Sequence, residues 1–259
     1  SGIEVAIRSV NLIYTHILIK KFTNLPYEFD SILKYLLRLN YIFLKKHLSL
    51  YSSANNHLTA ELMGLIAITS YFKFKNSGNL KRKYANKLEK EFERQVTNEG
   101  VHKEHAIGYH AEVFDHFLLS FHFLNNSGYL INDKQYTKLI KMSEFLKNMK
   151  GQSDYYPHIG DCDEGKVLYP YNDKNFNLFT SIIESGEILK GNTTKKDLRN
   201  YLIFGNKVPS CYSNRFYDTS KNKNLKIYKN SGYAIFNDKN YKFIFDFGDL
   251  GLSRSEERR

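Results

Sequence analysis

The chain has 259 residues, of which 42% are hydrophobic and 25% charged, so it can bury a substantial core and has an ordinary globular composition. No run reaches about 18 consecutive apolar residues, and Glu4 and Arg8 interrupt the apolar N-terminal pattern, so we expect no transmembrane helix and no signal peptide. The net charge of +11 favours an acidic polysaccharide, a nucleic acid or an anionic membrane surface as partner, although a solvated lysine-rich surface explains it equally well.

The first 200 residues carry a helical period of apolar side chains. In the second segment, for example, this period runs through Ile32, Leu36, Leu39, Phe43 and Leu44. The breaks between segments are short, so neighbouring helices should pack antiparallel, and the absence of a fixed repeat favours an α/α toroid over a solenoid. The predicted helices are 3–21, 28–49, 57–74, 80–97, 109–125, 133–149, 173–189 and 195–204.

After residue 205 the pattern changes to short β-type runs. LKIYKN, GYAIFND and NYKFIFDFG are separated by turn residues, which is typical of an antiparallel meander. Three strands cannot bury both faces of a sheet, so they should pack on the helices or belong to a larger sheet. We therefore predict a mainly α protein: an α/α toroid at 1–205, a linker and the first strands of a truncated β-sandwich at 206–252, and a tail at 253–259.

Three polar segments are candidates for chemistry. The first is Asn55-Asn56-His57 at the start of the third helix, where Asn is also a favourable N-cap residue. The second joins Gln95 to the loop NEGVHKEHAIGYH at 98–110.

That loop places Glu104, His105, Tyr109 and His110 between two apolar helices, and loops on a rigid scaffold often carry catalytic groups. A zinc site built on its histidines is the alternative, but their spacing does not match the HExxH motif, so we expect no metal. A polar loop with a buried tyrosine hydroxyl is a further alternative.

The third segment is PHIGDCDEG at 157–165, which contains Asp161 and Asp163. It lacks the spacing of an EF-hand loop. Its carboxylates could hydrogen-bond sugar hydroxyls, but aspartate and glycine are also ordinary turn residues.

Taken in order, these segments resemble the heparinase II/III-like polysaccharide lyases, a group that includes related alginate lyases. The resemblance covers nearly the whole chain. The similar stretches are EVAIRSVNLIY at 4–14, SANNHLTAELMGL at 53–65, Q-x3-EG-x3-E-x4-YH at 95–110, PHIGDCDEG at 157–165 and SGYAIFNDKNYKFIFDFGDLG at 231–251.

The resemblance implies an α/α toroid followed by an antiparallel β-sandwich, and eliminative cleavage of uronate-containing polysaccharides without a cofactor. By motif, Asn56 corresponds to the asparagine that faces the uronate carboxylate, with His57 beside it, and Tyr109 corresponds to the catalytic tyrosine, followed by His110. It also suggests a periplasmic or cell-envelope location.

Elimination needs donors for the charge that develops on the uronate carboxylate, a base for the C5 proton and an acid for the departing O4. Asn56, His57 and Arg8 suit the first role, and Tyr109 suits the other two if positive charge from His105 or His110 stabilises its phenolate. Further substrate contacts are expected from residues in all three segments, namely Asn55, Gln95, Glu104, His105, Asp161 and Asp163.

The sequence departs from the family pattern after Leu252, where a further catalytic histidine is expected and none occurs. We therefore expect weak or no lyase activity. Two alternatives remain: an α/α-barrel glycoside hydrolase, for which Glu104 and Asp161 are the best carboxylates, and a non-catalytic glycan-binding remnant. Because no nucleic-acid-binding module is recognisable, the expected partner is an acidic polysaccharide, with no nucleic acid and no membrane insertion.

Overall fold

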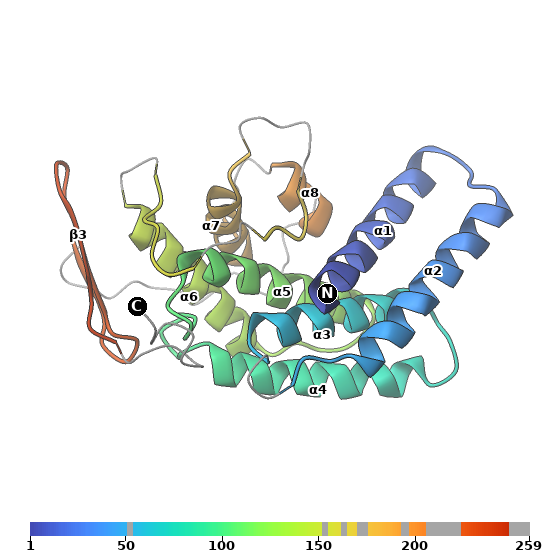
Figure 1. The fold of residues 1–259 in the computed structure, drawn as a ribbon. Helices are drawn as coiled ribbons and strands as arrows, with labels where there is room; N and C mark the ends of the chain where they lie inside the picture. Colours follow the sequence, from blue (N-terminus) through green and yellow to red (C-terminus); the bar gives the residue numbers. More distant parts are fainter. Residues whose placement is uncertain are drawn as a thin grey trace. The chain divides into compact units, whose positions relative to one another are not determined.

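The computed structural model describes residues 1–50, 54–151, 155–161, 165–169, 176–192, 197–205 and 224–248. Within these ranges it has eight helices followed by a three-stranded antiparallel sheet (Figure 1). The predicted class, mainly helical with antiparallel strands after the helices, is therefore confirmed. The elements are α1 (Gly2–Phe22), α2 (Tyr27–Lys46), α3 (Asn56–Tyr71), α4 (Ser77–Gln95), α5 (Ile107–Asn126), α6 (Asp133–Lys150), α7 (Leu178–Leu189), α8 (Leu198–Phe204), β1 (Leu225–Tyr228), β2 (Tyr233–Asn237) and β3 (Lys242–Asp246).

The chain divides into two compact units, and each is described by itself. Unit 1 comprises residues 1–92 and 115–131, and unit 2 comprises residues 93–114 and 132–259. The predicted boundaries at residues 205 and 252 follow the change from helices to strands, and they stay a prediction.

Unit 1 is built on the packing of α1 against α3. A capping box between Ser1 and Glu4 starts α1, and α3 is buried on almost every side. The two helices approach closely because Gly64 has no side chain: a Cβ there would lie 2.8 Å from the Cα of Ala6. Within the described residues α1 alone is long and apolar enough to cross a membrane, but a core helix passes the same test, and its buried face packs inside unit 1.

Helix α2 corrects one expectation from the sequence. Of the predicted stripe, Leu44 is buried, but the other four members are between 40% and 59% exposed, namely Ile32, Leu36, Leu39 and Phe43. The residues that α2 buries are Leu33, Leu37 and Leu44. The helix carries two apolar stripes, and the hydrogen bond from Asn40 Nδ2 to Ser9 Oγ at 3.0 Å fixes which of them faces α1.

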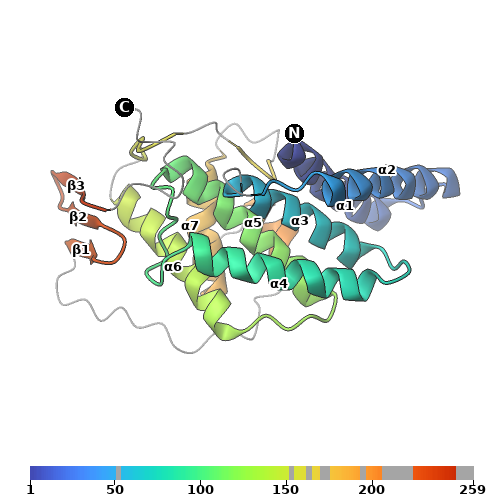
Figure 2. The same ribbon diagram turned by 60° about the horizontal axis from the view of Figure 1, so that its bottom comes forward.

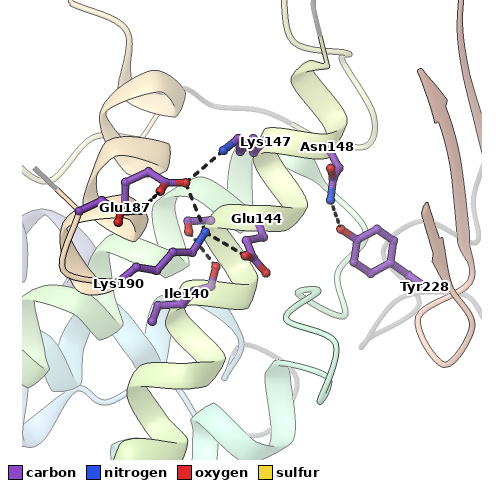
Figure 3. A network of polar contacts seen from close by, with 9 residues as sticks. Ile140, Glu144, Lys147, Asn148, Glu187, Lys190 and Tyr228 are labelled. Atoms are coloured by element: carbon purple, nitrogen blue, oxygen red, sulfur yellow. Dashed lines mark hydrogen bonds and ion pairs between the residues drawn. The ribbon is translucent and has the colours of Figure 1, made fainter. Parts of the chain in front are cut away.

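In unit 2, α6 and α7 are joined by a network of charges (Figure 3). Lys190 Nζ lies 2.9 Å from Glu144 Oε1 and 3.3 Å from Glu187 Oε1, and Lys147 Nζ lies 3.1 Å from the same Glu187 oxygen. Burial raises the pKa of Glu187, but hydrogen bonds from Asn192 and Lys147 and the charge of Lys190 outweigh it, so the pKa is lowered overall. The two helices are therefore held by a partly buried network rather than by an isolated surface pair.

The sheet of unit 2 lies against α6 through β2 (Figure 2). Its strand order is β1-β2-β3, and the side chains of Tyr233 and Ile235, on one face of β2, are fully buried. Asn148 of α6 donates to Tyr228 Oη at 2.7 Å, and its carbonyl accepts from Asn237 Nδ2 at 2.8 Å. The sheet therefore packs on a helix with one face, as the sequence predicted, while Phe243 and Phe245 on the other face are exposed.

Replacing Gly64 tests the close packing of unit 1. We expect Gly64→Leu to lower the free energy of unfolding by about 1–3 kcal/mol, because the new side chain must displace α1. The matched change Gly78→Ala, at a glycine of α4 with nothing within 4 Å of an added Cβ, should be neutral or stabilising by up to about 1 kcal/mol. Urea denaturation measures both; equal effects would contradict this packing argument.

Candidate active site

The loop between α4 and α5 is a small, tightly bonded hairpin of unit 2. Val96 and His102 form an antiparallel bridge, and Lys103 N donates to the carbonyl of Gln95 at 2.9 Å. The turn needs Gly100, because its φ is +82° and an added Cβ would lie 2.5 Å from the backbone of Lys141. The hairpin is therefore seated directly on α6.

Two predicted site residues are buried beneath this hairpin. Gln95 is fully buried, and its Oε1 accepts from His102 Nε2 at 3.3 Å. His110 is 1% exposed, its Nε2 donates to the carbonyl of Met142 at 3.0 Å, and its Nδ1 accepts from His102 N at 3.3 Å. Burial lowers the pKa of His110 to about 4, so its ring is neutral at pH 7. The expectation that His110 could supply positive charge to Tyr109 is therefore wrong: its ring anchors the loop to α6.

His105 has a different environment. It is 17% exposed, and its φ of 55° places a non-glycine residue in the left-handed region, a kind of strain that clusters at functional sites. Its ring lies against Tyr233, with centroids 5.2 Å apart, and its Nδ1 lies 3.7 Å from Asp246 Oδ2. Of the two histidines expected to bring positive charge near Tyr109, His105 is the one that faces a carboxylate.

Backbone contacts at two glycines bring the sheet to His105. A Cβ on Gly248 would lie 2.4 Å from Cε1 of the His105 ring, and a Cβ on Gly232 would lie 2.0 Å from the Cα of Gly248. Burial and the carboxylate of Asp246 raise the pKa of Tyr233, so its phenol remains protonated and donates to the carbonyl of His105 at 3.4 Å. Ser231 also ties the sheet to the hairpin by donating to Glu99 Oε2 at 2.7 Å.

The third predicted segment lies beside the same loop. Ile107 N donates to the carbonyl of Ile159 at 3.0 Å, and Gly160, with a φ of +69°, leaves only 2.7 Å between an added Cβ and the Cα of Ala106. The half-buried Asp161 follows directly, whereas Asp163 lies outside the described residues. Unit 2 thus brings the 95–110 loop, the turn at 157–161 and the end of β3 together.

Tyr109 lies in the first turn of α5, four residues after His105, and is half-buried. Glu104, which precedes His105, is also half-buried. Tyr109 is therefore not completely buried, and complete burial would prevent contact with a substrate.

The remaining predicted residues belong to unit 1. Asn55 stands at the N-cap of α3, yet its side chain makes no capping hydrogen bond, so capping does not explain its identity. Asn56 is 7% exposed, His57 is exposed, and Arg8 is exposed on α1.

His116, a buried histidine of α5 outside the three polar segments, lies next to the start of α3. Its Nδ1 is 2.9 Å from Thr59 Oγ1, which itself donates to the carbonyl of Asn56 at 2.8 Å. Burial lowers the pKa of His116 to about 3, and the charge of His57 adds to this effect. The ring is therefore neutral at pH 7, and it helps to hold the backbone that carries Asn56.

Within the described ranges, no group of three or more His, Cys, Asp or Glu side chains converges as a metal ion would require. Unit 2 carries the phenol of Tyr109, the carboxyl group of Glu104 and the imidazole of His105, whose Nδ1 lies 3.7 Å from Asp246 Oδ2. Phenol, imidazole and carboxyl groups are side chains that can act in general acid–base catalysis.

The chain is similar to a known protein family. The family model described as the heparinase II/III N-terminus matches residues 1–182, which include all three polar segments. The chain belongs to the heparinase II/III family. Comparisons with curated proteins and with solved structures give no match. Membership of this family supports a polysaccharide as substrate and a lyase as the type of enzyme.

Three residues beyond the matched range were not singled out from the sequence, although the resemblance included their segment. They are Ser231, Tyr233 and Asp246, all on or next to the sheet that contacts His105. A signal for Tyr233 and Asp246 was present in the sequence: each alternates along its strand with aromatic residues, so it lies on the face of the sheet opposite to them.

The buried histidine of the loop predicts a pH dependence of stability. Because the pKa of His110 is about 4 in the folded chain and about 6.5 when unfolded, the unfolded state binds protons more readily, and stability falls as the pH drops from about 6.5 towards 4. His110→Gln retains a donor for Met142 and should reduce the loss of stability between pH 7 and pH 5 by about 1–2 kcal/mol, measured by urea denaturation. His47→Gln, at an exposed histidine, is the control; an unchanged pH dependence in His110→Gln would refute the assignment.

Proposed function

We propose that the chain is a polysaccharide lyase that cleaves a uronate-containing acidic polysaccharide by β-elimination. The observation that carries the proposal is the half-buried Tyr109, placed four residues after a strained His105 that faces Asp246, in a chain of the heparinase II/III family. The net charge of +11 suits an anionic chain as substrate. Alginate-like polymers and glycosaminoglycans both belong to this chemical class.

The proton transfers are assigned to Tyr109. A free phenol has a pKa of about 10, so its use as a base requires a neighbouring positive charge. Protonated His105 would supply that charge, and Asp246 would orient the imidazole from the sheet. After Tyr109 removes the C5 proton, the C5 electron pair forms the C4–C5 double bond as the C4–O4 bond breaks. The O4 atom then takes a proton from Tyr109.

Stabilisation of the charge that develops on the uronate carboxylate is assigned to Asn56, His57 and Arg8. The Asn56 amide, the exposed His57 imidazole and the Arg8 guanidinium are donors that stabilise an enolate-like carboxylate. Asn55, the N-cap residue of α3, is proposed to assist. In unit 2, Glu104, Asp161 and Asp163 are proposed to contact sugar hydroxyls, whereas the burial of Gln95 favours a structural role for that side chain.

Tyr109→Phe tests the proposal. With a polyuronate substrate, ultraviolet absorbance detects the conjugated double bond of an elimination product, and C5 proton exchange in D2O detects proton removal even where O4 departs slowly. We expect Tyr109→Phe to lower both rates by about a hundredfold or more, because the variant loses its acid–base group. Tyr241→Phe, at an exposed tyrosine outside the site, is the matched control.

The outcomes separate the alternatives. New reducing ends without the double bond would indicate a glycoside hydrolase. Binding of polyuronate with neither double-bond formation nor C5 exchange would indicate a non-catalytic glycan-binding protein. Equal activity of Tyr109→Phe and the original chain would contradict the role given to Tyr109.

A further inference from the structure

Unit 2 contains a cavity of about 280 Å³ that the reaction described above does not use. Its wall includes Ile107 and Gly108 from the first turn of α5, a loop that includes Tyr155, Tyr156 and His158, and Phe179 from the start of α7. The volume is at the lower end of ligand cavities, so it suits one sugar ring rather than an oligosaccharide.

The cavity wall is rich in aromatic rings. Tyr156 and Phe179 stack on each other with centroids 4.3 Å apart and an interplanar angle of 23°, so the pair is held in one orientation. Tyr155 of the same wall is 82% exposed. Aromatic faces favour the C–H faces of sugar rings, because both surfaces are apolar and flat.

The charged groups of the wall favour an acidic sugar. Lys166 lines the cavity, and its Nζ lies 4.9 Å over the ring of Tyr169, which holds the ammonium group in place. No carboxylate belongs to the wall among the residues that the structure describes. The nearest, Glu112, is buried behind Gly165, where an added Cβ would lie 2.8 Å from its carboxyl carbon.

The position of the cavity relates it to the proposed reaction. Gly108 lines it, and Tyr109 is the next residue of the same helical turn, so a sugar in the cavity lies within about one side-chain length of the turn that carries the phenol. Residues 107, 108 and 111 share one side of α5, whereas Tyr109 projects about 155° away from that side. The cavity therefore shares the first turn of α5 with Tyr109 but does not contain its side chain.

We propose that this cavity is a subsite for an acidic sugar residue of the polysaccharide, distinct from the residue that reacts, with the ring stacked on the aromatic wall and its carboxylate bound by Lys166. The proposal rests on the proposed function, because it takes the acidic polysaccharide as ligand. The subsite selects a sugar residue away from the cleaved bond, and Lys166 discriminates acidic from neutral residues.

Calorimetric titration of the 259-residue chain tests the subsite, with a uronic acid tetrasaccharide and a glucose tetrasaccharide as probes. Tyr155→Ala should weaken the binding of both probes by about fivefold, because both lose a stacking surface. Lys166→Met keeps the aliphatic stem and should weaken only the acidic probe, by about tenfold, since a charged hydrogen bond is lost. Tyr241→Ala and Lys239→Met, at exposed positions of the β2–β3 turn, should leave both affinities within twofold.

The titration distinguishes the subsite from the catalytic proposal. Tyr109→Phe should retain the acidic-probe affinity within about twofold while losing C5 exchange, so loss of exchange with intact binding leaves the subsite standing. The subsite is overturned if neither probe binds, if Tyr155→Ala has no effect, or if Lys166→Met weakens both probes equally. Each variant is used only where its thermal unfolding midpoint is unchanged. If Tyr155→Ala unfolds, Tyr155→Leu is used in its place, because leucine removes the aromatic ring and keeps an apolar contact.

Discussion

The arrangement of the candidate site depends on the close backbone approach between the end of the sheet and the 95–110 loop. Gly248 leaves no room for a side chain beside the ring of His105, and Gly232 leaves none beside Gly248. With those two glycines in place, Tyr233 and Asp246 reach His105 from the strands. A segment more than 120 residues further along the chain therefore sets the conformation of a loop whose φ at His105 is unfavourable for an isolated residue.

The two histidines near the start of α5, His105 and His110, differ in their burial. His110 has both ring nitrogens in hydrogen bonds to backbone groups, and loss of solvation keeps it neutral. His105 is partly exposed, and its Nδ1 lies 3.7 Å from a carboxylate oxygen of Asp246. The ring of His110 anchors the loop to α6, and the ring of His105 is the one to which the proposed reaction gives a role. Two histidines only five positions apart thus lie in different environments.

The sequence predicted the elements well because their periodicity is local. Every predicted helix and strand corresponds to an observed one, with ends that differ by a few residues. Predictions that depended on long-range packing were less accurate, and the buried face of α2 is the example. This helix has two apolar stripes, and its packing partners determine that Leu33 and Leu37 are buried rather than Ile32 and Leu36.

The same reasoning explains which parts of the site were visible in advance. The loops of the site were predictable because they are rich in polar residues and lie between apolar helices. The environment of His110 was not, since it depends on a carbonyl group of α6. The position of Asp246 was not either, since it depends on how the strands pair. Alternation along β3 places Asp246 opposite Tyr233, on the face turned away from the exposed Phe243 and Phe245. A shift of one residue in that register would turn the carboxylate away from His105 and present a phenylalanine instead, so the pairing of β2 with β3 is itself a condition for the proposed chemistry.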